Sequence, residues 1–253
     1  MPAELRATAL GRIGYVDGWR LQEAVAARLA AGGPERLLLL EHDPVYTIGR
    51  RGTLDHLTAS PAELRAAGAS VYRVDRGGDI TYHGPGQLVG YPILSLGEGP
   101  DVVAYVRALE EGLRATLADF GIASSTIDGK TGVWVTLRDG HDFGSGQVGK
   151  IAAIGVRVSR GVTRHGFALN VNTDLAAFDR MIPCGFRHEV GSFARLGVSA
   201  TVAQVAAACA ARLGERLGRM LVWDAEIPSP REDEIPADAP VRRAEDLLGA
   251  VAA

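Results

Sequence analysis

The chain has little lysine, little cysteine and no long apolar run. Lys130 and Lys150 are its only lysines, although lysine and arginine together number 27. Cys184 and Cys209 are its only cysteines, too few for the multi-bridge framework of a small secreted domain. No stretch of about 18 apolar residues predicts a membrane span, and no signal-peptide pattern opens the chain. We therefore expect a reduced, cytoplasmic protein that does not associate with membranes.

Several catalytic and binding motifs are also absent. No Gly-Lys-Ser/Thr follows the glycine-rich segment, which argues against a Walker A loop, and no G-x-G-x-x-G opens a helix, which argues against a dinucleotide site. A serine nucleophile on a G-x-S-x-G turn is missing as well. Cys184, His188, His165 and His83 do not form C-x-x-C or H-x-x-x-H pairs, so zinc fits poorly. We expect neither a metal nor a cofactor.

The composition is that of an ordinary globular protein. Hydrophobic residues make up 47% of the 253 residues and charged residues 23%. The formal net charge of −3 favours neither nucleic acid nor an anionic membrane as a partner. This length suits one large domain or two small ones.

The pattern of elements predicts an α/β fold, with a mixed sheet and packed helices in a single domain over residues 1–226. Strands and helices do not alternate regularly, which argues against a doubly wound sheet. Pro92 lies inside one strand pattern, so we expect that strand to be an edge strand or to carry a bulge. Residues 227–253 form a Pro-rich, acidic tail with one possible short helix. Helices are predicted over 19–29, 60–67, 101–120 and 201–217, and strands over 37–40, 71–74, 87–94, 132–137, 151–158 and 167–171.

The two cysteines differ in their surroundings. Cys184 lies between Pro183 and Gly185, a setting that suits a thiol displayed on a turn, although a small core residue would also fit. Cys209 lies among alanines in a predicted amphipathic helix, which is typical of packing.

A thiol nucleophile needs a partner that favours the thiolate. Arginine cannot exchange a proton, but a desolvated lysine can. Lys150 precedes the apolar strand IAAIGV, so its stem is partly buried or it lies at a solvated strand end. Lys130 follows Asp128-Gly129 and is interpreted as a loop charge.

The densest unusual segment is RGGDITYHGPGQ, residues 76–87. One interpretation is a stretch of exposed backbone against which a thin substrate lies, with His83 pointing into the site. The alternative is two tight turns and a hydrogen-bonded histidine, because glycine clusters alone are weak signals.

Four long motifs occur in order: LLLLEHDPVYTIGRRG, RGGDITYHGPGQLVGYPIL, GKIAAIGVRVSRGVTRHGFALNVNTDL and IPCG. Together they resemble the lipoyl(octanoyl) transferases of the biotin/lipoate protein ligase superfamily, from about residue 10 to about residue 219. The resemblance implies a single mixed α/β domain of the lipoate-ligase type. It also implies an acyl thioester on Cys184, with Lys150 as its acid/base partner. The substrate contacts that it implies are Arg76, Gly77, Gly78, Asp79, Ile80, Thr81, Tyr82, His83, Ala153, Ile154, Gly155, Gly166, Phe167 and Ala168.

The resemblance further implies an acyltransferase acting as a monomer. Its donor would be octanoyl-acyl carrier protein, and its acceptors would be apo lipoyl domains of 2-oxoacid dehydrogenase complexes and the glycine cleavage H protein. Two alternatives stay open: an ATP-dependent lipoate or biotin ligase on the same fold, and a module that only binds lipoyl domains. The Pro183-Cys184-Gly185 segment and the HGPGQ loop favour transfer over ligation, and Cys184 together with Lys150 argues against simple binding.

Overall fold

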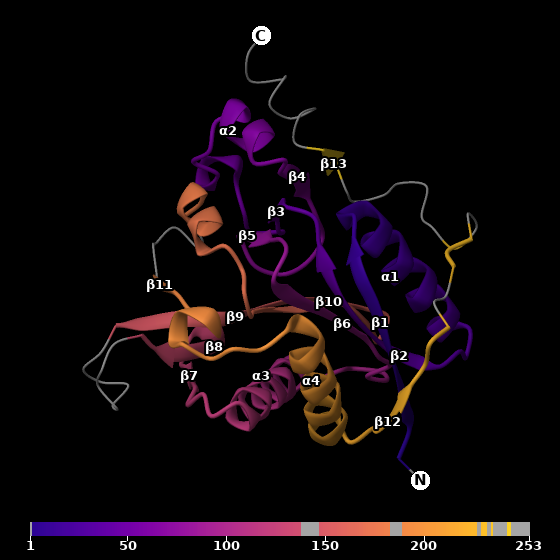
Figure 1. Cartoon of the computed structure of the whole chain (residues 1–253). Coiled ribbons are helices and arrows are strands. Elements are labelled where there is room, and N and C mark those ends of the chain that lie inside the picture. The colour runs from indigo at the N-terminus through magenta and orange to yellow at the C-terminus, as the bar shows by residue number, and fades with distance from the viewer. Residues whose placement is uncertain are drawn as a thin grey trace.

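A computed structural model describes residues 2–137, 147–182, 189–226, 229–231, 234 and 242–243. Within these ranges a large mixed sheet forms the centre of the molecule (Figure 1). Its strand order is β12-β1-β2-β6-β10-β9-β8-β7, with β11 paired to β9. β1 is parallel to β12 and to β2, β11 is parallel to β9, and the other neighbours are antiparallel. The strands are β1 (Glu4–Ile13), β2 (Glu35–His42), β6 (Gln87–Ile93), β7 (Ser125–Ile127), β8 (Lys130–Thr136), β9 (Val148–Ser159), β10 (Val162–Asn170), β11 (Glu189–Val190) and β12 (Met220–Trp223).

Helices cover both faces of this sheet. α3 (Val102–Asp119) and α4 (Val202–Leu217) pack side by side on one face, and α1 (Tyr15–Ala30) lies on the other (Figure 1). The N-caps agree with the sequence pattern: the Asp101 carboxylate accepts from Ala104 N at 2.9 Å, and Thr201 begins α4 with a capping box. No helix in the described part of the chain is long and apolar enough to cross a membrane.

A smaller sheet lies above the large one in Figure 1, with strand order β13-β4-β3-β5. β3 is parallel to β4 and antiparallel to β5. Its own core packs Tyr46, Ile48 and Ile80 against α2 and a 3-10 helix, η2. The remaining elements are β3 (Val45–Ile48), η1 (Leu54–His56), α2 (Pro61–Ala66), β4 (Ser70–Arg73), β5 (Ile80–His83), η2 (Leu175–Arg180), η4 (Ala194–Leu196) and β13 (Arg242–Arg243).

The apolar runs of the sequence become the core. Leu37 and Leu39 point toward α3 and α4, whereas Leu38 and Leu40 point toward α1, as the two-residue period of a strand requires. All four side chains are at most 3% exposed. This explains why β2 is an uninterrupted apolar run: it is buried on both faces.

The predicted helices and strands between residues 19 and 217 all form, with boundaries that extend or shift by a few residues. Of the tail segment 241–253, where a short helix was expected, residues 242–243 form β13 and the others lie outside the described residues. The expected α/β class with a mixed sheet and packed helices is confirmed. The strands β1, β3, β5 and β12 were not predicted; β1 has 10 residues and the other three have four each.

The expectation of an edge strand at Pro92 is wrong, because β6 is an interior strand between β2 and β10. The proline is tolerated there because the ladder with β10 is interrupted between Gly90 and the Ser95–Val162 bridge, so no backbone bond on that side requires its missing N–H. Instead the Thr163 hydroxyl donates to the Pro92 carbonyl at 2.7 Å. The Thr163 side chain therefore satisfies the Pro92 carbonyl where the backbone ladder is interrupted.

The described residues of the tail contact the folded body at two places. Arg28 of α1 donates to the Glu234 carboxylate at 2.6 and 2.7 Å, and the backbone of β13 pairs with β4. The tail is thus attached, although neither contact belongs to a hydrophobic core cluster.

Deleting residues 227–253 should lower the melting temperature by only a few degrees, because the described residues of the tail are attached by one surface ion pair, with Arg28 30% and Glu234 8% exposed, and by a two-residue strand. A surface ion pair contributes about 1 kcal/mol or less, and 1 kcal/mol shifts a protein of this size by about 2–4 °C. The expected activity should stay within a few-fold. Full-length Glu234→Gln is the matched control for the Arg28 contact. Loss of a cooperative thermal transition in the truncated chain would show instead that the tail is part of the fold.

Candidate active site

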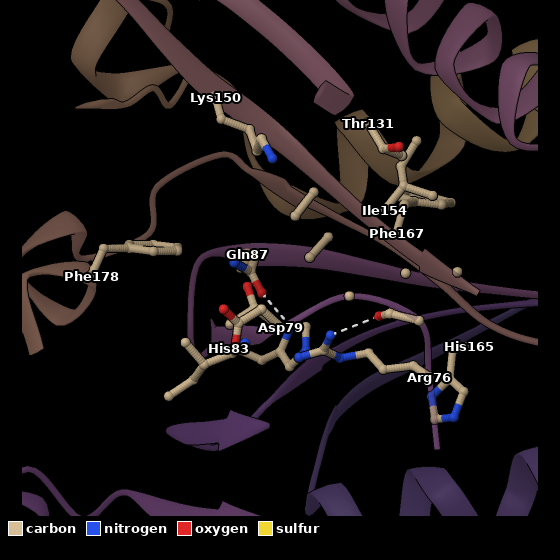
Figure 2. Close-up of a pocket in the computed structure, with 18 of the residues that line it drawn as sticks. Arg76, Asp79, His83, Gln87, Thr131, Lys150, Ile154, His165, Phe167 and Phe178 are labelled. Carbon is tan, nitrogen blue, oxygen red and sulfur yellow. Dashed lines mark hydrogen bonds between the residues drawn. The ribbon is translucent and has the colours of Figure 1, made fainter. Parts of the chain in front are cut away.

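A cavity of about 530 Å³ lies between the small sheet and the large one. β5 and the glycine-rich loop at residues 76–79 form one wall, and β8, β9 and β10 form the other. Figure 2 shows Lys150 and Phe178 entering from one end and Arg76 and His165 lying toward the other.

Backbone hydrogen bonds hold the glycine-rich loop in place. Three amides of residues 49–51 donate to carbonyls of residues 76–79 over 3.0 to 3.1 Å. The Arg76 guanidinium donates to the Thr47 carbonyl at 2.6 Å and to the Gly77 carbonyl at 2.9 Å. The loop is therefore a fixed wall, and its backbone groups are largely satisfied within the protein.

The same loop docks onto the large sheet. Gly77 N donates to Val156 O at 2.9 Å. A Cβ on Gly155 would lie 2.8 Å from Gly77 O and 3.2 Å from Arg76 Cδ. The space beside Gly155 is thus filled by the loop's backbone, which explains why glycine is needed there.

A β-bulge in β9 aims Lys150 into the cavity. In the pairing with β8, Val133 lies opposite Ala152 and Trp134 opposite Lys150, so Ile151 is an extra residue. Ile151 and Ala152 both belong to the core beneath α3 and α4. In a regular strand Lys150 and Ala153, three positions apart, would face opposite sides. The bulge brings both onto the cavity side, where each lines the wall.

Both lysines of the chain lie over one buried indole. Lys150 Nζ is 4.8 Å from the centre of the Trp134 ring, and Lys130 Nζ is 5.8 Å from it. The negative face of an indole attracts an ammonium group. Lys130 is thus not only a loop charge: it begins β8 and lines the same cavity as Lys150.

Two histidines close to the cavity are neutral because they are buried. Burial lowers the pKa of His42 to about 4 and that of His83 to about 3. A ring nitrogen of His42, Nδ1, lies 3.0 Å from Ile13 O. A carbonyl can only accept, so Nδ1 carries the proton and Nε2 accepts from the Tyr91 hydroxyl at 2.6 Å.

A charged cluster lies behind the cavity at Asp75. His165 Nε2 is 2.8 Å from one carboxylate oxygen, and Arg157 and Arg164 lie 3.1 and 2.9 Å from the other. Burial raises the pKa of Asp75, but the His165 hydrogen bond and the nearby positive charges outweigh it and lower that pKa overall. Arg164 also pairs with Glu23 of α1. His165 itself is neutral, since burial lowers its pKa.

The chain matches the family described as Lipoyl protein ligase A/B catalytic domain over residues 14–214. It is 50% identical over 198 residues to an octanoyltransferase of Solibacter usitatus, covering 78% of this chain and 85% of that one. It is 46% identical over 238 residues to an octanoyltransferase of Rhodococcus jostii, covering 92% and 86%. The chain belongs to the lipoyl protein ligase A/B family.

The fold agrees with this assignment. A T. acidophilum protein described as a lipoate protein ligase, solved with bound lipoic acid, superposes with a TM-score of 0.70 at 18% identity, covering 91% of each chain. At that identity the likeness concerns the fold alone. The expected class, an acyltransferase, is confirmed by the relatives at 46–50% identity, which are named octanoyltransferases.

Most of the predicted site residues of this family member meet in one cavity. Lys150 and the three predicted substrate-contact segments all line it, with the exception of Tyr82. Tyr82 packs in the core of the small sheet, with its ring 5.2 Å from that of Tyr46 and 5.6 Å from that of Phe178. Cys184 lies outside the described residues, whereas Cys209 is fully buried in the core of α4, where burial raises its thiol pKa to about 12.

Sequence reasoning missed other residues of the cavity. Their signals were weak, because single aromatic or amide residues carry no motif. In the sequence, Gln87 lies at the end of the glycine-rich segment and Asn170 lies near the end of a predicted strand. Only the fold brings these two residues together. The missed lining residues include Tyr15, His56, Gln87, Tyr91, Lys130, Trp134, His165, Asn170 and Phe178.

Gly155→Ala should displace the glycine-rich loop, because the new Cβ would lie too close to Gly77 O. We expect a loss of about 1–3 kcal/mol in the free energy of unfolding, as for other overpacking changes, together with a clear loss of activity. Gly14→Ala is the control, since its Cβ would meet only the movable Asp17 carboxylate at 3.2 Å. Chemical denaturation of both variants is the measurement. A stable, active Gly155→Ala protein would contradict the tight docking.

Proposed function

We propose that the chain, acting as a cytoplasmic monomer, transfers an octanoyl group from octanoyl-acyl carrier protein to a lysine of apo lipoyl domains. The acceptors would be the lipoyl domains of 2-oxoacid dehydrogenase complexes and the glycine cleavage H protein. The intermediate is an octanoyl thioester on Cys184. One observation carries this proposal: the β9 bulge directs one of the two lysines of the chain into a cavity formed by the motif segments.

The position of Cys184 in the chain supports its role. Met181, three residues before it, lines the cavity, and so does Val190, six residues after it. Ile182 N donates to His56 O at 2.8 Å, and β11 pairs with β9 beside Lys150. The chain on both sides of Cys184 is thus fixed at the same cavity as Lys150.

In the first step the Cys184 thiolate attacks the carbonyl carbon of the carrier thioester. A new carbon–sulfur bond forms and the bond to the carrier sulfur breaks, while Lys150 gives its proton to that sulfur. One thioester replaces another, so the step is close to balanced in free energy. No ATP is consumed.

In the second step the neutral amine of the acceptor lysine attacks the acyl-enzyme. The carbon–nitrogen bond forms, the bond to Cys184 breaks, and the amine proton passes to Lys150, which restores the starting enzyme. The product is an amide, which is more stable than the thioester, so the step is favourable overall.

Incubation with octanoyl-acyl carrier protein, without ATP, should attach one octanoyl group at Cys184, labile to hydroxylamine. Intact mass and peptide mapping measure this. Cys184→Ser should abolish the adduct, and Cys209→Ser should keep it, because Cys209 is 0% exposed. An acyl group on Cys209 or none at all would overturn the mechanism. Strict dependence on ATP and free octanoate would favour the ligase alternative.

Lys150→Arg should be severely impaired, because arginine keeps the charge but cannot give up its proton near neutral pH. Acid/base groups contribute about 10² to 10⁴ in rate, and we expect a loss of that order. Lys130→Arg is the matched control over the same indole and should stay near wild type. Single-turnover acylation and transfer are measured beside a thermal melt. Near-normal rates for Lys150→Arg would leave Lys150 with an electrostatic role only.

A further inference from the structure

A relay of side-chain amides determines which ring nitrogen of His83 carries the proton. Asn170 Nδ2 donates to Gly191 O at 3.0 Å, and because a carbonyl only accepts, the orientation of the Asn170 amide is determined. Its oxygen therefore accepts from Gln87 Nε2, at 2.9 Å. Gln87 Nε2 also donates to Tyr82 O at 3.2 Å, which requires the same orientation.

The orientation of Gln87 decides the tautomer of His83. With its nitrogen committed, Gln87 presents Oε1 to His83 Nδ1 at 2.8 Å. Nδ1 must then carry the proton, and Nε2 carries the lone pair. The tautomer is thus set by backbone carbonyls at the far end of the relay, through two side chains that are at most 4% exposed.

The second nitrogen of His83 is available to a ligand. Nε2 has no hydrogen-bond partner in the part of the chain that the structure describes, yet it is not among the fully buried unpartnered atoms of those residues. His83 lines the cavity and is only 7% exposed. Its ring stacks on Tyr15 with an interplanar angle of 9°. A neutral, fixed acceptor therefore faces the cavity.

The relay also reaches Lys150. Gly191 O accepts from Asn170, and Gly191 N donates to Lys150 O at 3.0 Å. His83 is therefore linked to the backbone of Lys150 by hydrogen bonds through Gln87 and Asn170 and by the backbone of Gly191. In Figure 2 the Lys150 side chain points from β9 toward the part of the cavity where Asp79, His83 and Gln87 lie.

Because His83 Nε2 is a fixed hydrogen-bond acceptor, the group that it contacts must donate a hydrogen bond. In the proposed reaction the octanoyl chain has no donor, but the acceptor lysine brings N–H groups. As its nitrogen bonds to the acyl carbon, those N–H groups become more acidic and need an acceptor. We propose that His83 Nε2 accepts a hydrogen bond from the incoming lysine amine, and that Gln87 and Asn170 are positioning residues that hold it in this tautomer.

This role of His83, which rests on the proposed function, includes no proton transfer. The amine nitrogen bonds to the acyl carbon, the bond to sulfur breaks, and the released proton passes to Lys150 as before. His83 orients the attacking nitrogen and remains neutral throughout. It therefore acts in the second half of the reaction and not in the first.

The test separates the two half-reactions by single turnover. His83→Phe keeps the ring that stacks on Tyr15 but removes both nitrogens, and Gln87→Leu keeps His83 but breaks the relay. In both variants we expect acylation by octanoyl-acyl carrier protein within about three-fold of wild type. Transfer from the preformed acyl-enzyme to an apo lipoyl domain should fall about 10- to 100-fold, the usual effect of losing an orienting partner.

Asn172→Ala is the matched control. Asn172 also donates its amide to a backbone carbonyl, Ala200 O at 2.8 Å, but it does not line the cavity. Both half-reactions should be unchanged in this variant. A thermal melt of each variant excludes unfolding, and if His83→Phe does not fold, Gln87→Leu decides.

Nitrogen NMR of the wild-type imidazole gives a readout that packing alone would not move. In the wild type His83 should carry its proton on Nδ1. In Gln87→Leu the proton should no longer be confined to Nδ1. A proton on Nε2 in the wild type would overturn the proposal. Two further results would also overturn it. One is an equal loss of both half-reactions, which would mean that His83 Nε2 contacts the acyl carrier protein substrate as well, and the other is no loss of transfer. Absence of wild-type acylation would instead refute the proposed function, while the NMR result would stand.

Discussion

The Gly77 amide donates to the Val156 carbonyl at 2.9 Å, and this bond joins the loop of the small sheet to the large sheet. Both backbones line the cavity, at Gly77 on the loop and at Gly155 on the large sheet. The close approach of the loop to the large sheet depends on Gly155. The approach of the same loop to the end of β3 depends on Gly49, where a Cβ would lie 2.5 Å from Gly78 O. Glycine at these positions therefore provides room for the protein's own backbone, and only indirectly for an acyl chain.

The bulge at Ile151 adds the second constraint. With both Ile151 and Ala152 in the core, β9 keeps its apolar contacts with α3 and α4 and still turns Lys150 to the other face. A bulge costs one unpaired residue, and strands near active sites commonly carry one to re-aim a side chain. β11 then pairs beside Lys150 and brings the chain that follows Cys184 to the same edge.

Sequence patterns predicted the fold where local and global preferences agree. The Leu37–Leu40 run, the capping box at Ser60 and the periodic faces of α3 and α4 each determine one structure locally. The bulge escaped prediction because the run IAAIGV is apolar throughout, so its alternation does not reveal a change of face. The Gln87–Asn170 relay escaped for another reason: its members are 83 residues apart, and only the pairing of β6 with β10 brings them together.

Pro92 is a case in which a sequence rule gave a wrong expectation. The rule that proline avoids interior strands assumes that every ladder position needs a donor, but the ladder between β6 and β10 is interrupted between Gly90 and Ser95, and the Thr163 hydroxyl donates to the Pro92 carbonyl.

Electrostatics then divide the cavity into two parts. At one end, His42 and His165 are neutral because burial lowers their pKa values, and the Asp75 carboxylate is held by Arg157, Arg164 and His165. That end of the cavity therefore carries no imidazolium charge, and the Arg76 guanidinium that lies there donates to the Thr47 and Gly77 carbonyls. The ammonium groups of Lys130 and Lys150 lie at the other part, over Trp134. Coulombic interactions are stronger in a medium of low effective dielectric constant than in water, and the buried Trp134 ring beneath Lys150 provides such a surface.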